Sequence, residues 1–202
     1  MTHTHPARRS TTALTVSSII LIILSIPALA YEVRGAIDGA TNSTVALAVG
    51  ASCVSALVGL VFLAWLARFT PSILSWIAAF AWGTGGALLI AGIGNGVTDA
   101  AMETSISDAQ TADVVTSVVT GPLIEETAKG IGALILILTA RKVLQRPAQG
   151  AVLGGLVGIG FAWGEDIGYY VSALDEGMGG LWESFLARAL LGAFGHAIFT
   201  GV

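Results

Sequence analysis

Long apolar stretches separated by short polar connections dominate the pattern of this chain. Each stretch is long enough to cross the hydrocarbon core of a bilayer as a helix. We therefore predict an all-α fold, a polytopic transmembrane helix bundle that forms one integral membrane domain over residues 1–202. After a polar tail at residues 1–12, about six spans are expected, near 13–30, 45–67, 72–94, 115–139, 149–172 and 182–202.

Composition supports the same class. Hydrophobic residues make up 54% of the chain and charged residues only 11%, whereas about a quarter of the residues of a soluble domain are charged. The net charge of -4 comes without any basic run that could follow a phosphate backbone, so nucleic acid is excluded as a partner. We expect a multi-pass protein of the cell (plasma) membrane whose first partner is the lipid bilayer.

The charges in the connections differ in sign from one side to the other. We predict that the N-terminus lies inside, so that the outer connections carry the acidic residues with a single base, Arg34. The inner segments then carry no acid, as the positive-inside rule requires, and they contain Arg8, Arg9, Arg68, Arg141, Lys142 and Arg146.

The first apolar stretch allows two interpretations. It ends in Pro27-Ala28-Leu29-Ala30, which fits the cleavage site of a secretory signal peptide as well as the end of a first membrane helix. We favour the uncleaved helix, because the rest of the chain is membranous. Residue 31 lies on the outer side in both cases.

Two further features concern the packing of the spans. Residues 95–116 form the longest and most acidic connection, which we expect to be a surface loop, with a substrate-gating lid as the alternative. Glycines recur every four residues through the fifth span, and such small-residue rows let helices approach closely in lipid. This span is therefore predicted to lie in the centre of the bundle.

Several ionisable side chains remain inside the predicted spans, where they are costly and usually functional. They lie on three helices, within Glu-Glu-x-x-Lys at 125–129, Phe-x-x-x-Glu-Asp-x-x-Tyr at 161–169 and His-x-x-x-Thr at 196–200. Spacings of three and four residues bring side chains to one helix face. Each helix thus offers one polar stripe to a common interior.

These three motifs, in this order on successive membrane helices, resemble those of the PrsW family of intramembrane proteases. The resemblance covers a protease-like core at residues 115–202. It implies a peptidase that cuts a membrane-anchored, single-span regulatory protein such as an anti-sigma factor. Members of the family continue to a further histidine-bearing helix, whereas this sequence stops at Val202. A fragment and an incomplete site are both open as explanations.

The chemistry of the motifs suits peptide hydrolysis, which needs an activated water, a donor to the oxyanion and a proton for the leaving amine. We predict Glu125 as the base, Glu126 as its helper and His196 as a second water ligand or oxyanion donor. Glu165 completes the polar cage. The supporting residues are Lys129, Phe161, Tyr169 and Thr200.

Metal dependence is left open by the sequence. Glu125, Glu165 and His196 offer three ligands for zinc and leave a position for water. Zinc sites usually take more nitrogen or sulfur than one histidine supplies, and Lys129 adds positive charge beside the site. We therefore favour metal-free glutamate catalysis without a cofactor, and keep zinc as the alternative.

Asp166 and Arg188 lie at similar depth in the predicted spans. We expect a structural salt bridge between them, or snorkelling of Arg188 to the outer headgroups, in preference to a catalytic role.

Other functions compete with hydrolysis. A proton-coupled transporter or channel also needs acids that face a wet cavity, and a non-catalytic scaffold descended from a protease is a further alternative. The ordered motifs favour the protease.

Overall fold

A computed structural model of the chain describes residues 6–66, 72–189, 196, 198, 200 and 201, without the side chains of residues 6–10, 65 and 66. The described residues contain no strand, which confirms the all-α fold. The helices are α1 (Pro6–Ala36), α2 (Asn42–Leu66), α3 (Ile73–Ala81), η1 (Trp82–Ala87), α4 (Leu88–Ser105), α5 (Ala109–Val115), η2 (Thr116–Thr120), α6 (Gly121–Ala140), α7 (Pro147–Leu174) and α8 (Met178–Ala187).

Three helical segments are long and apolar enough to cross a membrane, by length and composition. They are Thr11–Ala36, Asn42–Ala64 and Ile73–Ser105, and the last joins α3, η1 and α4 into one continuous helix. They support the prediction of an integral membrane protein. The fourth and fifth predicted spans correspond to α6 and α7, which carry the charged motifs. Residues 190–195 of the sixth predicted span lie outside the described residues. So does Arg68, one of the bases predicted to lie on the inner side.

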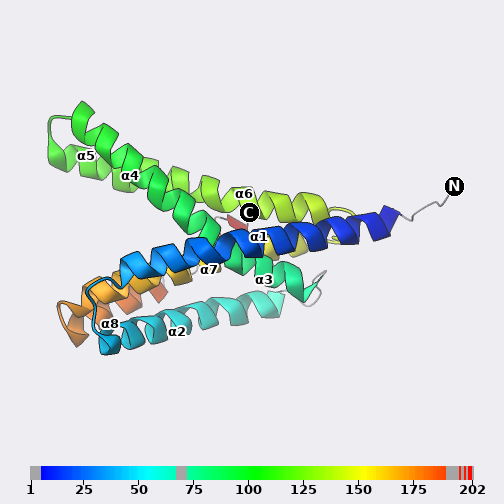
Figure 1. Ribbon diagram of the computed structural model, residues 1–202, viewed down its shortest axis with the longest axis horizontal. Coiled ribbons are helices and arrows are strands. Elements are labelled where there is room, and N and C mark those ends of the chain that lie inside the picture. The colour runs from blue at the N-terminus through cyan, green and yellow to red at the C-terminus, as the bar shows by residue number, and fades with distance from the viewer. Residues whose placement is uncertain (1–5, 67–71, 190–195, 197, 199, 202) are drawn as a thin grey trace.

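The segment predicted to be a long surface loop is mostly helical, so that prediction was wrong. Helix α4 continues to Ser105, and α5 begins after three intervening residues, at Ala109. Asp108 caps α5 by accepting a hydrogen bond from the Thr111 amide, 2.9 Å away, which satisfies one of the free N–H groups at the helix start. The two helices form a hairpin that extends away from the rest of the bundle (Figure 1).

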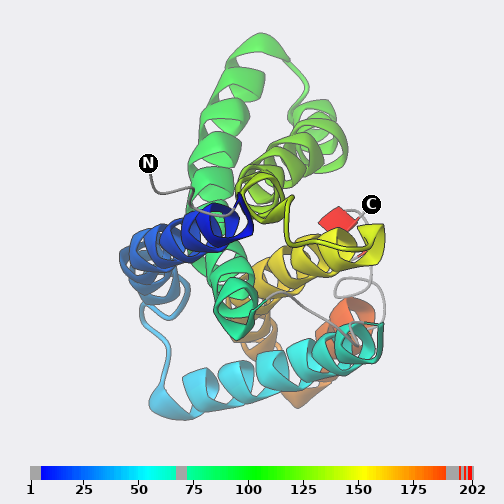
Figure 2. The ribbon, with the colours of Figure 1, turned by 90° about the vertical axis from the view of Figure 1, so that its right-hand side faces the viewer.

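Helix α7 lies in the middle of the bundle, as its glycine rows predicted. It packs against α2, α3, η1, α6 and α8, and Figure 2 shows it between α6 and α2. A Cβ atom added at Gly160 would lie 2.2 Å from the Phe80 carbonyl oxygen, and one added at Gly154 would lie 2.2 Å from that of Thr200. These approaches exclude any side chain larger than hydrogen at either position.

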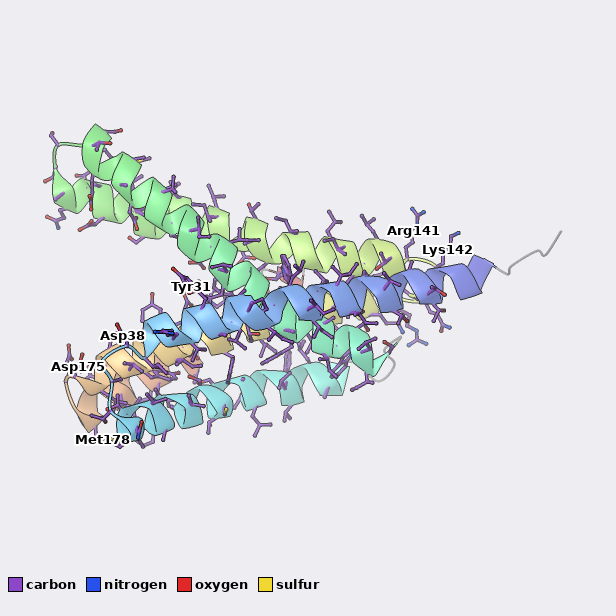
Figure 3. All side chains as sticks on the ribbon, in the orientation of Figure 1. Tyr31, Asp38, Arg141, Lys142, Asp175 and Met178 are labelled. Carbon is purple, nitrogen blue, oxygen red and sulfur yellow. The ribbon has the colours of Figure 1, made fainter. Side chains whose placement is uncertain are left out.

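The charges of the connections lie at opposite ends of the molecule. Arg141 and Lys142 mark a basic end, where α1 also begins, while Asp38 and Asp175 mark an acid-rich end (Figure 3). The hairpin of α4 and α5 turns on the acid-rich side (Figure 1). This separation agrees with the charge pattern of the connections, and the assignment of the basic end to the inner side stays a prediction of the positive-inside rule.

Candidate active site

Helix α6 is held against the bundle by Trp82 of η1. The indole nitrogen of Trp82 donates a hydrogen bond to the Ala128 carbonyl oxygen, 3.0 Å away. Gly132 lies one turn further along α6, and a Cβ atom added there would lie 2.2 Å from the Trp82 ring. The glycine thus admits the indole, and the hydrogen bond fixes the turn of α6 that carries the acidic pair. Sequence reasoning missed this role of Trp82, because a tryptophan in an apolar run gives no sign of its partner.

Lys129 is the centre of the polar cluster, and its side chain is completely buried. Its ammonium nitrogen lies 2.7 Å from Glu126 Oε1 and 3.7 Å from Glu125 Oε2 on the same helix. The same nitrogen lies 2.7 Å from His196 Nδ1 and 4.0 Å from the centre of the Phe161 ring. Opposite charge, hydrogen bonds and an aromatic face together compensate for the burial of a cation.

The contact with Lys129 defines the tautomer of a neutral His196. An ammonium group has three N–H donors and no acceptor, so the Nδ1 atom facing it must accept. In the neutral imidazole the proton then lies on Nε2, which faces Glu165 Oε2 at 3.6 Å. The Phe161 ring packs beside the imidazole, with ring centres 5.5 Å apart. Residues from α6, α7 and the last described segment thus meet, as the three motifs predicted.

The two glutamates of α6 have different surroundings. Glu126 is bonded to Lys129, and its Oε2 atom accepts a hydrogen bond from the Thr200 hydroxyl at 3.1 Å. Within the described part of the chain, Glu125 accepts no side-chain hydrogen bond and has only the ion pair with Lys129. Its carboxylate is therefore the less constrained of the two.

Glu125 borders a cavity of about 430 Å³. The walls come from the α4–α5 hairpin, the start of α6 and Tyr169 of α7, and they carry acidic side chains. The lining residues are Asn95, Asp99, Glu103, Ala112, Asp113, Thr116, Ser117, Gly121, Glu125 and Tyr169. Sequence reasoning did not expect this cavity, although the four-residue spacing of Asp99 and Glu103 on one helical face would have been the signal for an acidic wall.

Arg188 links the acidic pair of α7 to the end of α8. Its guanidinium donates to Asp166 and to Glu165, and it stacks on the Tyr169 ring with Cζ 3.8 Å from the ring centre. The predicted salt bridge with Asp166 is confirmed. The bond to Glu165 was not predicted, because the rotation of α8 relative to α7 cannot be read from residue spacing.

The donors that the sequence offered to zinc do not fit a metal ion in this arrangement. The described residues hold no group of three or more His, Cys, Asp or Glu side chains arranged to bind a metal. Of the three candidate ligands, Glu165 is bonded to Arg188, and His196 has its Nδ1 atom against the Lys129 ammonium. A histidine that binds a metal usually donates its second ring N–H to an acceptor, and an ammonium cannot accept. We derive no step through a metal.

A comparison with protein-family profiles matches residues 71–202 to a family described as PrsW family intramembrane metalloprotease. No curated protein and no solved structure matches the chain. The family match covers more than half of the chain and includes all three charged motifs. It confirms the resemblance seen in the motifs, and the chain belongs to the PrsW family of intramembrane metalloproteases, which are peptidases.

Proposed function

We propose that the protein is an intramembrane endopeptidase that hydrolyses a peptide bond of a membrane-anchored, single-span protein with a water molecule activated by Glu125. One observation carries the proposal. Of the two glutamates beside the buried Lys129, Glu125 borders the cavity and accepts no side-chain hydrogen bond within the described residues. A base needs both access to water and an available oxygen lone pair.

The proposed reaction begins with a water molecule in the cavity. Glu125 takes a proton from this water as its oxygen attacks the carbonyl carbon of the scissile bond. The Nε2–H group of His196 donates to the oxyanion that forms, which is the charge that a preorganised donor stabilises best. Glu125 then gives its proton to the nitrogen of the leaving amine as the C–N bond breaks.

The surrounding residues keep these groups in place. Lys129 holds Glu126 and His196 through two contacts of 2.7 Å, so it orients the imidazole and offsets one negative charge of the acidic pair. Thr200 bonds the far oxygen of Glu126. Glu126 is thus a helper whose own oxygens are occupied, and Glu165 completes the cage opposite His196.

The proposed substrate follows from the family and from the cavity. A hydrolase within a membrane acts on chains that reach it there, and a cavity of about 430 Å³ suits an extended peptide segment better than a folded domain. We propose a single-span regulatory protein of the cell membrane, of the anti-sigma-factor type, as the substrate.

The test is cleavage of a single-span protein by the purified enzyme in lipid vesicles. Glu125→Gln should lower the cleavage rate by about 10²–10⁴-fold, the usual contribution of a general base. His196→Ala should lower it by about 10²–10³-fold, the usual cost of losing one oxyanion donor. Glu176→Gln, which alters an exposed carboxylate in the α7–α8 turn, is the matched control and should cleave normally. Undiminished cleavage by Glu125→Gln would refute the assignment of the base. Loss of activity with a chelator, restored by added metal, would overturn the metal-free reaction.

A further inference from the structure

Arg188 makes more contacts than a simple salt bridge requires. It follows α8 directly, and its guanidinium bonds both consecutive carboxylates of α7, Glu165 and Asp166, while it stacks on Tyr169. One of these carboxylates and the tyrosine belong to the proposed site: Glu165 faces His196, and Tyr169 lines the cavity. The cation therefore joins the site to the end of α8.

The two carboxylates bound by Arg188 differ in how firmly they are held. Asp166 is only 2% exposed, and its Oδ2 atom accepts a hydrogen bond from the Tyr170 hydroxyl at 3.3 Å. That hydroxyl also contacts Ser55 Oγ of α2, 3.0 Å away. Asp166 thus belongs to a buried chain of hydrogen bonds that reaches a third helix.

Within the described residues, no such chain of hydrogen bonds holds Glu165. Its side chain is 19% exposed. Among the described residues, its polar contacts are the bond from Arg188 and the approach of His196 Nε2 at 3.6 Å. A glutamate has three rotatable side-chain bonds, so without Arg188 its carboxylate would be free to leave the imidazole.

We propose that Arg188 is a positioning residue of the peptidase site: Asp166 fixes the guanidinium, and the guanidinium holds the Glu165 carboxylate opposite His196. The inference rests on the proposed function. It assigns to Arg188 a part in the reaction, beyond the structural salt bridge with Asp166.

The chemistry of the side chain supports this assignment. A planar guanidinium presents its donors in a rigid fork and can bond two carboxylates while its face stacks on an aromatic ring. A lysine in the same place offers a compact point charge on a flexible stem. It would keep the charge balance and one ion pair, and it would lose the fixed geometry between the carboxylates.

The first test is Arg188→Lys, measured as kcat and KM for cleavage and as thermal unfolding of the purified protein. We expect a fall in kcat of about 10–100-fold, because a misplacement of about 1 Å at a reacting site can cost about 10²-fold, with KM and the unfolding temperature nearly unchanged. A purely structural ion pair predicts an unchanged kcat and a lower unfolding temperature. A lysine variant with wild-type kcat would therefore overturn the proposal.

The second test keeps the proposal falsifiable if the lysine variant folds poorly. Arg188→Ala is assayed with added guanidinium chloride, against sodium chloride at the same ionic strength. The side chain is 17% exposed, so a small cation from water can reach its place. We expect guanidinium, and not sodium, to restore at least about tenfold of the lost kcat. Equal effects of the two salts would contradict positioning by the guanidinium.

A parallel assay of Glu125→Gln separates the two proposals. If this variant cleaves as well as the wild type, the proposed base is wrong, whatever the Arg188 variants do. If Glu125→Gln is inactive while Arg188→Lys is fully active, the base stands and the positioning role of Arg188 fails.

Discussion

Helices α6 and α7 each carry two consecutive carboxylates, and each pair of carboxylates contacts one cation. The α6 group and the α7 group of charged side chains are built differently. On α6, the completely buried Lys129 approaches Glu125, Glu126 and His196 from within the cluster. On α7, Arg188 comes from α8 and is divided between Glu165 and Asp166. The first cation belongs to the same helix as its acids, and the second connects two helices.

The two groups differ in whether a carboxylate borders the cavity. The α6 group leaves the Glu125 carboxylate beside the cavity, whereas Asp166 of the α7 group is enclosed by Arg188 and Tyr170. We therefore propose that the acid pair of α6 is the reactive group and that the acid pair of α7 is an anchor. Access to the cavity, and not the number of charges, separates the two.

The largest effect on stability is expected at the cation of the α6 group. Lys129→Met removes the charge while keeping an unbranched side chain, and it removes the donor that Glu126 and His196 share. Breaking a buried ion pair costs about 3–5 kcal/mol. Because the glutamates partly reach water, we expect about 2–3 kcal/mol here, with loss of cleavage.

Denaturant unfolding in detergent micelles measures this change. Lys142→Met, at an exposed position of the basic end, is the control and should unfold like the wild type. A stable and active Lys129→Met variant would show that the buried cation does not hold the site together.

The anchor on α7 can be tested with a double-mutant cycle. Arg188→Ala should destabilise the protein, because it leaves the nearly buried Asp166 carboxylate without its cation. Adding Asp166→Asn should restore part of the loss, with a coupling energy of about 0.5–3 kcal/mol. Unfolding of the single and double variants gives that energy. Strictly additive losses would mean that the two residues do not stabilise each other.

The smallest effect is expected at Thr200. Thr200→Val keeps the shape of the side chain and removes the hydroxyl that bonds Glu126 Oε2 at 3.1 Å. A hydrogen bond to a charged group contributes about 1.5–3 kcal/mol, and Glu126 keeps its bond from Lys129. We expect a fall in kcat of about tenfold or less, measured in the vesicle assay. A loss as large as that of Glu125→Gln would give Thr200 a greater part than a helper.

The sequence predicts most of the helical architecture, because length and apolar content are local properties. The central place of α7 also follows from its glycine rows, since close approach needs hydrogen side chains at positions such as Gly160. The error at residues 95–116 has a physical cause. Polar helices that leave a bundle as a hairpin carry the same residue types as a surface loop, and the cap at Asp108 becomes visible only when the turn is located.

The site is predictable only in part. Motif spacing brought Lys129 and the two glutamates to one helix face, and their meeting with His196 agrees with the predicted common interior. Contacts that depend on the rotation of one helix relative to another could not be predicted from the sequence. The Trp82 bond to Ala128, the Arg188 bond to Glu165 and the acidic cavity all join segments whose relative orientation no spacing rule provides.

The most direct test of this account compares Glu125→Gln with Asp166→Asn in one vesicle assay, with rates expressed per folded enzyme. Glu125→Gln should lose about 10²–10⁴-fold in kcat with an unchanged unfolding temperature. Asp166→Asn should unfold at a lower temperature and retain more activity than Glu125→Gln. The reverse pattern, an active Glu125→Gln and a stable but inactive Asp166→Asn, would contradict the claim that α6 carries the reactive acid and α7 the anchor.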